Sequence, residues 1–78
     1  MALIEVGRVS DAFAKDAPRH LVIMEEEVVQ DSVIIRPTRA RISIEIAHQP
    51  ITAISLDYIG VDVLIANLEG VKRRMRGE

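Results

Sequence analysis

The sequence predicts a small two-layer α+β domain, in which an antiparallel sheet of three to four strands is covered by one long C-terminal helix. Two patterns lead to this fold class. Residues 38–47 alternate strictly between apolar and polar side chains, as a half-buried strand does. From about residue 56 to residue 76, apolar residues recur at spacings of three and four, which is typical of an amphipathic helix. The 78 residues are enough for a single domain, residues 1–78.

Four stretches rich in aliphatic or β-branched residues are expected to form the sheet. They are residues 2–9, 20–29, 32–36 and 38–47. Proline cannot donate a hydrogen bond to a β-ladder, so Pro37 marks an edge, a bulge or a bend between the last two stretches. Residues 10–15 are expected to form one helical turn or a loop.

Residues 18–30 are compatible with two structures. As a helix, the segment would be capped by Asp16 and entered through Pro18, but Ile23 would then fall on its polar side. As a strand, it contains two apolar runs on either side of three glutamates, with no turn residue near Glu26 for a hairpin. We favour the strand.

The C-terminal helix is the clearest element. Its main apolar stripe follows spacings of four and three: Ile54, Tyr58, Val61, Ile65, Leu68, Lys72 and Met75, widened by Leu64 and Val71. Asp57 near the start and four basic residues near the end complement the helix dipole. Gly77 then provides a natural stop.

A second apolar patch lies nearly opposite this stripe on a helical wheel. We call it the second flank, and it consists of Ile59, Val63, Ala66 and Gly70. A helix that lies on one sheet needs a single apolar side, and so short a chain has few elements left to cover another. We therefore expect the second flank to be a protein interface, packed on a symmetry-related helix or on a different protein. The alternative is that Ile59 and Val63 contact the chain's own loop 10–18.

Nothing in the sequence indicates catalysis. The absence of cysteine excludes disulfides, thiolate zinc sites and cysteine nucleophiles. His20 and His48 are far apart in the sequence, and neither has an H-x-x-x-H companion. The glycines form neither of the common phosphate-binding motifs. Adjacent side chains of the glutamate triplet 25–27 point apart, so they converge poorly on one cation. We expect no catalytic residue, no cofactor and no metal.

The basic residues support an alternative function, which is binding of RNA or DNA. Its contact residues would be Arg36, Arg39, Arg41, Lys72, Arg73, Arg74 and Arg76, provided that the strand arginines and the helix tail lie side by side. A formal net charge of −2 and the lack of aromatic stacking partners argue against this function. The competing interpretation is that Arg39 and Arg41 pair with Glu45 and with acidic residues of the N-terminal half.

The function predicted from the sequence is therefore a non-catalytic protein–protein interaction module. It would be a homo-oligomer, with a dimer favoured, or an accessory subunit of a larger complex. No apolar run approaches the roughly 20 residues that cross a bilayer, and the N-terminus lacks the features of a signal peptide, so we expect a cytoplasmic protein without a membrane partner. Few amides and many Ile, Val and Arg suggest a heat-adapted source, although a GC-rich genome would give the same arginine bias.

Overall fold

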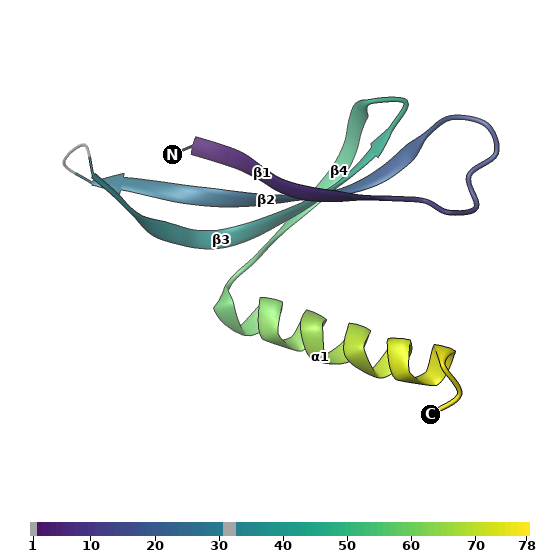
Figure 1. Cartoon of the computed structure of the whole chain (residues 1–78). Coiled ribbons are helices and arrows are strands. Elements are labelled where there is room, and N and C mark those ends of the chain that lie inside the picture. Colours follow the sequence, from purple (N-terminus) through teal and green to yellow (C-terminus); the bar gives the residue numbers. More distant parts are fainter. Residues whose placement is uncertain (1, 31–32) are drawn as a thin grey trace.

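The computed structural model describes the backbone of residues 2–30 and 33–78, and the side chains of residues 3–27 and 37–78. It contains a four-stranded antiparallel sheet followed by one helix (Figure 1). The elements are β1 (Ala2–Ser10), β2 (Arg19–Gln30), β3 (Val33–Ile46), β4 (Gln49–Leu56) and α1 (Tyr58–Met75). Strands that follow one another in the chain are neighbours in the sheet, in the order β1-β2-β3-β4. The predicted α+β fold is confirmed, and the segment 18–30 forms a strand, β2, from Arg19 to Gln30 instead of a helix.

Residues 33–36 and 38–46 of the two predicted strands 32–36 and 38–47 are parts of one long strand, β3, while residue 32 lies outside the described residues. Glu26 pairs with Arg39 and Glu27 with Pro37, so the ladder between β2 and β3 slips beside the proline, as a bulge does. The ladder between β3 and β4 covers only Ala40–Ile46. At Pro37, β3 therefore has a neighbour on one side only, where a missing N–H donor is tolerated.

Strand β4 differs from the sequence prediction, which placed Ile54 at the start of the helix stripe. Ala47 and His48 have positive φ angles of 52° and 65°, and this tight turn folds β4 back on β3. The helix begins only after Asp57, whose Oδ1 accepts a hydrogen bond of 2.8 Å from the Gly60 N–H. Ile54 thus lies in the strand because the hairpin turn and the N-cap bound the segment on either side.

The C-terminal end of α1 is a Schellman motif. Gly77 has a φ of 82°, its N–H donates to the Arg74 carbonyl, and the Glu78 N–H donates to the Arg73 carbonyl, both at 3.0 Å. The predicted stop at Gly77 is confirmed. At the other end of the chain, the segment between β1 and β2 is a loop, in which the Phe13 N–H donates to Asp11 Oδ1 at 2.9 Å.

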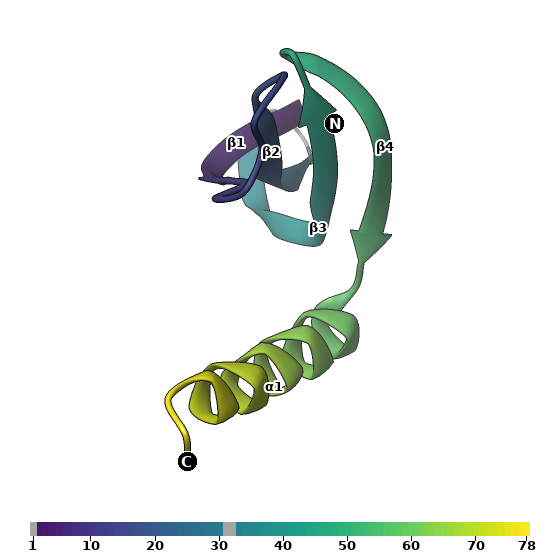
Figure 2. The same cartoon turned by 90° about the vertical axis from the view of Figure 1, so that its right-hand side faces the viewer.

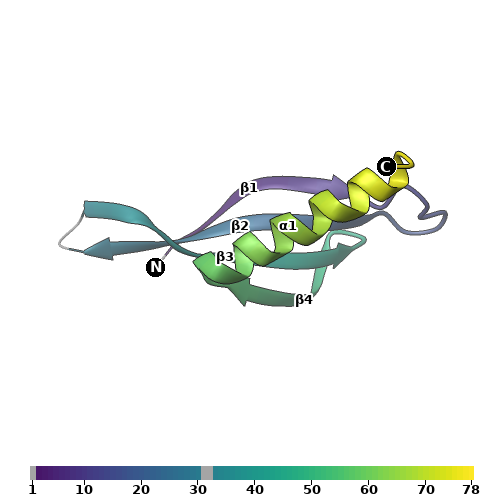
Figure 3. The same cartoon turned by 90° about the horizontal axis from the view of Figure 1, so that it is seen from below.

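The sheet has one apolar and one polar face, because residues opposite one another in the register share a face. The apolar face carries the rows Leu21–Ile44–Thr52 and Ile23–Ile42–Ile54. The polar face carries the rows His20–Glu45–Pro50, Arg8–Val22–Ser43 and Met24–Arg41–Ser55. Helix α1 lies on the apolar side of the sheet (Figures 1 and 3).

The helix does not close over the sheet. No residue of α1 is buried, and Val22 is the single buried hydrophobic side chain in the described part of the chain, at 1% exposure. The Cα radius of gyration is 15.0 Å, against about 11.5 Å for a compact domain of this length. The accessible surface is 6326 Å², against about 4,700 Å² for a compact monomer of 8.7 kDa. One copy therefore exposes about 1,600 Å² more than a chain of its mass normally does. The open arrangement is visible in Figure 2.

Candidate interaction surface

The second flank is exposed in the structure. Ile59 is 70% exposed and Val63 is 54% exposed, so the loop 10–18 does not cover them. Ala66 is also exposed, whereas Gly70 is partly covered: a Cβ added there would lie 3.5 Å from the Arg74 guanidinium. Ile59 and Val63 are therefore not buried within the chain. That the second flank binds a partner remains a prediction.

The main stripe of α1 is exposed to a similar degree, which the sequence pattern does not reveal. Ile65, Leu68 and Val71 are exposed, while Val61 and Leu64 are half-buried. Between α1 and the sheet lies an apolar cleft of about 330 Å³. Its lining comes from three strands and the helix: Leu21, Ile42, Ile44, Thr52, Ala53, Ile54, Leu64 and Leu68. The apolar face of the sheet and the helix thus face one another without packing closely.

The structure does not bring the strand arginines and the basic tail together. Arg39 lies near the start of α1, where it lines a shallow pocket with Ser55, Leu56 and Asp57. The basic tail, residues 72–76, is at the other end of the helix, about 21 to 27 Å from Tyr58 at 1.5 Å per residue. Arg41 is in the register row of Met24 and Ser55, two residues along β3 from Arg39 and on the same face, which is turned away from α1.

Two of these basic side chains also form ion pairs with glutamates. Arg39 Nη1 lies 4.0 Å from Glu26 Oε2, and Arg76 Nε lies 3.0 Å from Glu78 Oε2. The side chain of Arg36 is outside the described residues. Nucleic-acid binding remains an alternative prediction from the sequence, and the described arginines provide no continuous surface for it.

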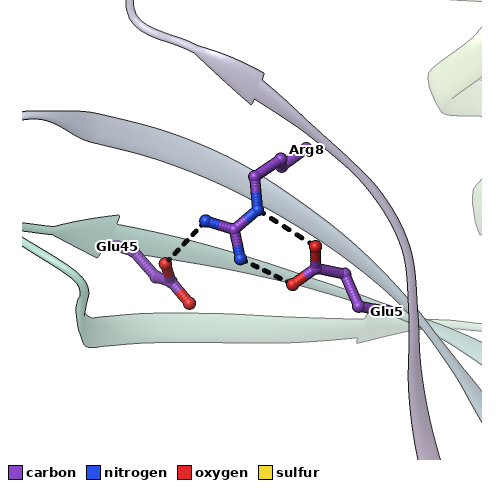
Figure 4. Close-up of polar contacts among 3 residues, drawn as sticks. All are labelled: Glu5, Arg8 and Glu45. Carbon is purple, nitrogen blue, oxygen red and sulfur yellow. Dashed lines mark hydrogen bonds and ion pairs between the residues drawn. The ribbon is translucent and has the colours of Figure 1, made fainter.

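A charged network crosses the polar face of the sheet (Figure 4). The Arg8 guanidinium on β1 donates two hydrogen bonds to the Glu5 carboxylate, at 3.0 and 2.6 Å, and a third of 3.4 Å to Glu45 on β3. This contact from β1 to β3 passes over β2, where Val22 is directly opposite Arg8 in the register. The aliphatic stem of Arg8 therefore lies beside the one buried hydrophobic residue described.

The network makes the stability contribution of Glu5 depend on pH. The hydrogen bond from Arg8 is the main reason that the pKa of Glu5 lies below its ordinary value of 4.5. A carboxyl with a lowered folded-state pKa stabilises the fold above its unfolded pKa, and this contribution is lost as the pH falls through the folded-state pKa. We therefore expect Glu5→Gln to lower the melting temperature slightly at pH 7.

The difference in melting temperature between the wild type and Glu5→Gln should shrink below pH 4.5. Circular dichroism melts between pH 3 and pH 7 would measure it. Glu69→Gln, at an exposed helical glutamate outside the network, is the matched control. A melting-temperature difference between the wild type and Glu5→Gln that is constant from pH 3 to pH 7 would contradict a lowered pKa of Glu5 in the folded protein.

Two histidines that the sequence separates are neighbours in the structure. The rings of His20 and His48 stack with centroids 6.1 Å apart and an interplanar angle of 24°. Nδ1 of His20 is buried, and no hydrogen-bond partner for it lies in the described part of the chain. Sequence reasoning missed this pair because only the β3–β4 turn, which carries His48 back beside β2, brings the rings together.

Neither a metal centre nor a membrane-crossing helix is found among residues 2–30 and 33–78. In this part of the chain, no three His, Asp or Glu side chains are grouped so that they could hold a metal ion. Helix α1 is too polar for its length to cross a bilayer. No protein-family model, curated protein or solved structure matches the chain.

Proposed function

We propose that the protein is a non-catalytic interaction module that works by self-association, with a dimer as its smallest form. The observation that carries this proposal is the apolar surface that one copy leaves open. Large aliphatic side chains are exposed on the helix and on the sheet, and a single described hydrophobic residue is fully buried. Monomeric proteins rarely expose continuous apolar patches larger than a few hundred Å².

The size of the excess surface supports association with a partner as large as the chain itself. About 1,600 Å² per copy is roughly twice what each partner contributes to a standard interface. If two copies cover this excess on one another, the total buried area falls in the range of obligate dimers, which runs from about 2,000 to 5,000 Å². Folding and association would then be coupled.

Light scattering on a size-exclusion column tests the proposal. At tens of micromolar we expect a mass about twice the 8.7 kDa of the chain. A clean 8.7 kDa monomer at that concentration would exclude self-association. A monomer that is captured by one specific protein would point to the accessory-subunit alternative, which uses the same exposed surface.

The second flank can be tested in the same experiment. Ile59→Lys combined with Val63→Lys is expected to weaken association at least about tenfold, because burial of a lysine charge without a partner is unfavourable. Both side chains are mostly exposed in one copy, so the substitutions remove few contacts within the chain and act mainly on association. Asp62→Asn combined with Asn67→Lys raises the net charge by the same two units on the same helix and is the matched control. Equal dissociation constants for the two variants would remove the second flank from the interface.

A further inference from the structure

The two outer edges of the sheet differ in how well they are protected. β1 carries the charged residues Glu5 and Arg8, and its pairing with β2 is irregular between Glu5 and Gly7. β4 has the sequence QPITAISL, which contains no charged residue. Its protective features are Pro50 near its start and the bulge at Ile51, after which the register with β3 is regular from Thr52 to Leu56. In Figure 2 no other described element lies beside the outer side of β4.

This difference matters because a free strand edge presents unpaired N–H and C=O groups. Proteins normally block such edges with charges, bulges or prolines. Both edge strands contain a bulge, but β1 carries a charged residue on each side of its bulge, whereas the five residues from Thr52 to Leu56 contain no charge, bulge or proline. We propose that β4 pairs antiparallel with β4 of a second copy, so that two sheets join into one of eight strands. This inference rests on the proposed self-association and adds the β4 edge to its surface.

A second copy fits this edge better than an unrelated strand. When a strand pairs with itself in antiparallel orientation, a twofold axis relates the two copies and both β4 edges are used at once. The joined sheet then ends on β1 at both sides, and β1 is the protected edge. The assembly consequently closes at two copies and does not continue into a filament.

The register of the pairing follows from the length of the regular stretch. Residues Thr52–Leu56 are centred on Ile54, so in-register pairing places Ile54 opposite its own copy. Ile54 is 57% exposed in the single chain, and the contact would cover it on both copies. The twofold axis runs perpendicular to the sheet, so both α1 helices and both apolar clefts lie on the same side of the joined sheet.

Cysteine cross-linking tests this register directly, because the chain contains no cysteine. Residues directly opposite in antiparallel strands have Cα atoms about 4.5–5.5 Å apart, which is within the range that a disulfide spans. Under mild oxidation at micromolar concentration, Ile54→Cys is expected to form a covalent dimer at least about tenfold faster than Val6→Cys. Val6 is the matched control because it lies on the opposite edge strand and is 59% exposed.

A second pair of variants tests the β4 edge without cross-linking. Ile54→Lys places two ammonium groups opposite one another and removes two aliphatic contacts, so we expect the dissociation constant to rise at least about 100-fold. Val6→Lys should leave the dissociation constant unchanged. Thr52→Lys, at an exposed position of the same strand, repeats the test if circular dichroism shows that Ile54→Lys does not fold.

The outcomes separate this inference from the proposed function. A monomeric wild type would overturn both. A dimeric wild type in which Ile54→Cys cross-links no faster than Val6→Cys, while the folded Lys variants of β4 remain dimeric, would overturn the β4 edge and leave self-association standing. Rapid cross-linking through Ile54→Cys together with monomeric Lys variants of β4 would establish the edge.

Discussion

A tenfold dilution of the protein is expected to lower its melting temperature by about 4 °C, provided that folding and dimerisation are coupled. Tenfold dilution changes the free energy of dissociation by about 1.4 kcal/mol. The entropy of unfolding is about 2.1 cal/mol/K per residue, or about 0.33 kcal/mol/K for two chains of 78 residues. The ratio of these two quantities gives the expected shift. A monomer that folds alone has a melting temperature that does not depend on its concentration.

The reason to expect this coupling is the structure of the single chain. Its apolar sheet face and its helix leave a cleft of about 330 Å³ between them, and no residue of α1 is buried. Circular dichroism melts at 2, 20 and 200 micromolar would measure the effect. Val6→Lys should show the same dependence on concentration as the wild type. A constant melting temperature over this range would contradict coupled folding, even if a weak dimer were detected.

Val22→Ala is expected to destabilise the fold by about 2 kcal/mol per chain, because it removes two methyl groups from a fully buried site and leaves a cavity. Val22 is 1% exposed and lies between Arg8 and Ser43 in its register row. Val9, on the neighbouring strand, is mostly exposed. Val9→Ala should therefore cost less than about 0.5 kcal/mol.

Urea unfolding of the two alanine variants at one fixed protein concentration would measure this difference. The fixed concentration keeps any contribution from association the same in both. Equal losses for Val22→Ala and Val9→Ala would show that the polar face does not contain the main packed site. A larger loss for Val9→Ala would indicate that the associated state buries the apolar face more deeply than one copy does.

The sequence predicted the strands β1 and β2 and the C-terminal helix because their signals are local. A helix or a strand repeats its side-chain directions every few residues, so apolar spacing reveals it directly. The same reasoning missed β4, because Ile54 is in phase with the helix stripe that continues at Tyr58. The boundary depends on the cap at Asp57 and on the turn at Ala47 and His48, which apolar spacing does not report.

The spacing of apolar residues does not predict contacts between residues that are far apart in the sequence. Arg8 on β1 and Glu45 on β3 come close only because β1, β2 and β3 pair in the observed register. The stacking of His20 and His48 has the same origin. The separation of Arg39 from the basic tail depends on the direction in which α1 leaves the sheet. The sequence alone therefore did not exclude a phosphate-binding surface shared by the strand arginines and the tail.

The sequence by itself determined that β1, β2 and the C-terminal helix form, that the helix is apolar on two sides, and that cysteine chemistry is absent. These properties are local or compositional, and they follow from residue types and their spacing. Only the tertiary structure decided that α1 lies apart from the sheet, that β4 is an uncharged outer edge, and that Ile54 is at the centre of its regular stretch. Those properties depend on how strands pair and how far a helix axis lies from a sheet, which are relations between segments that no local pattern encodes.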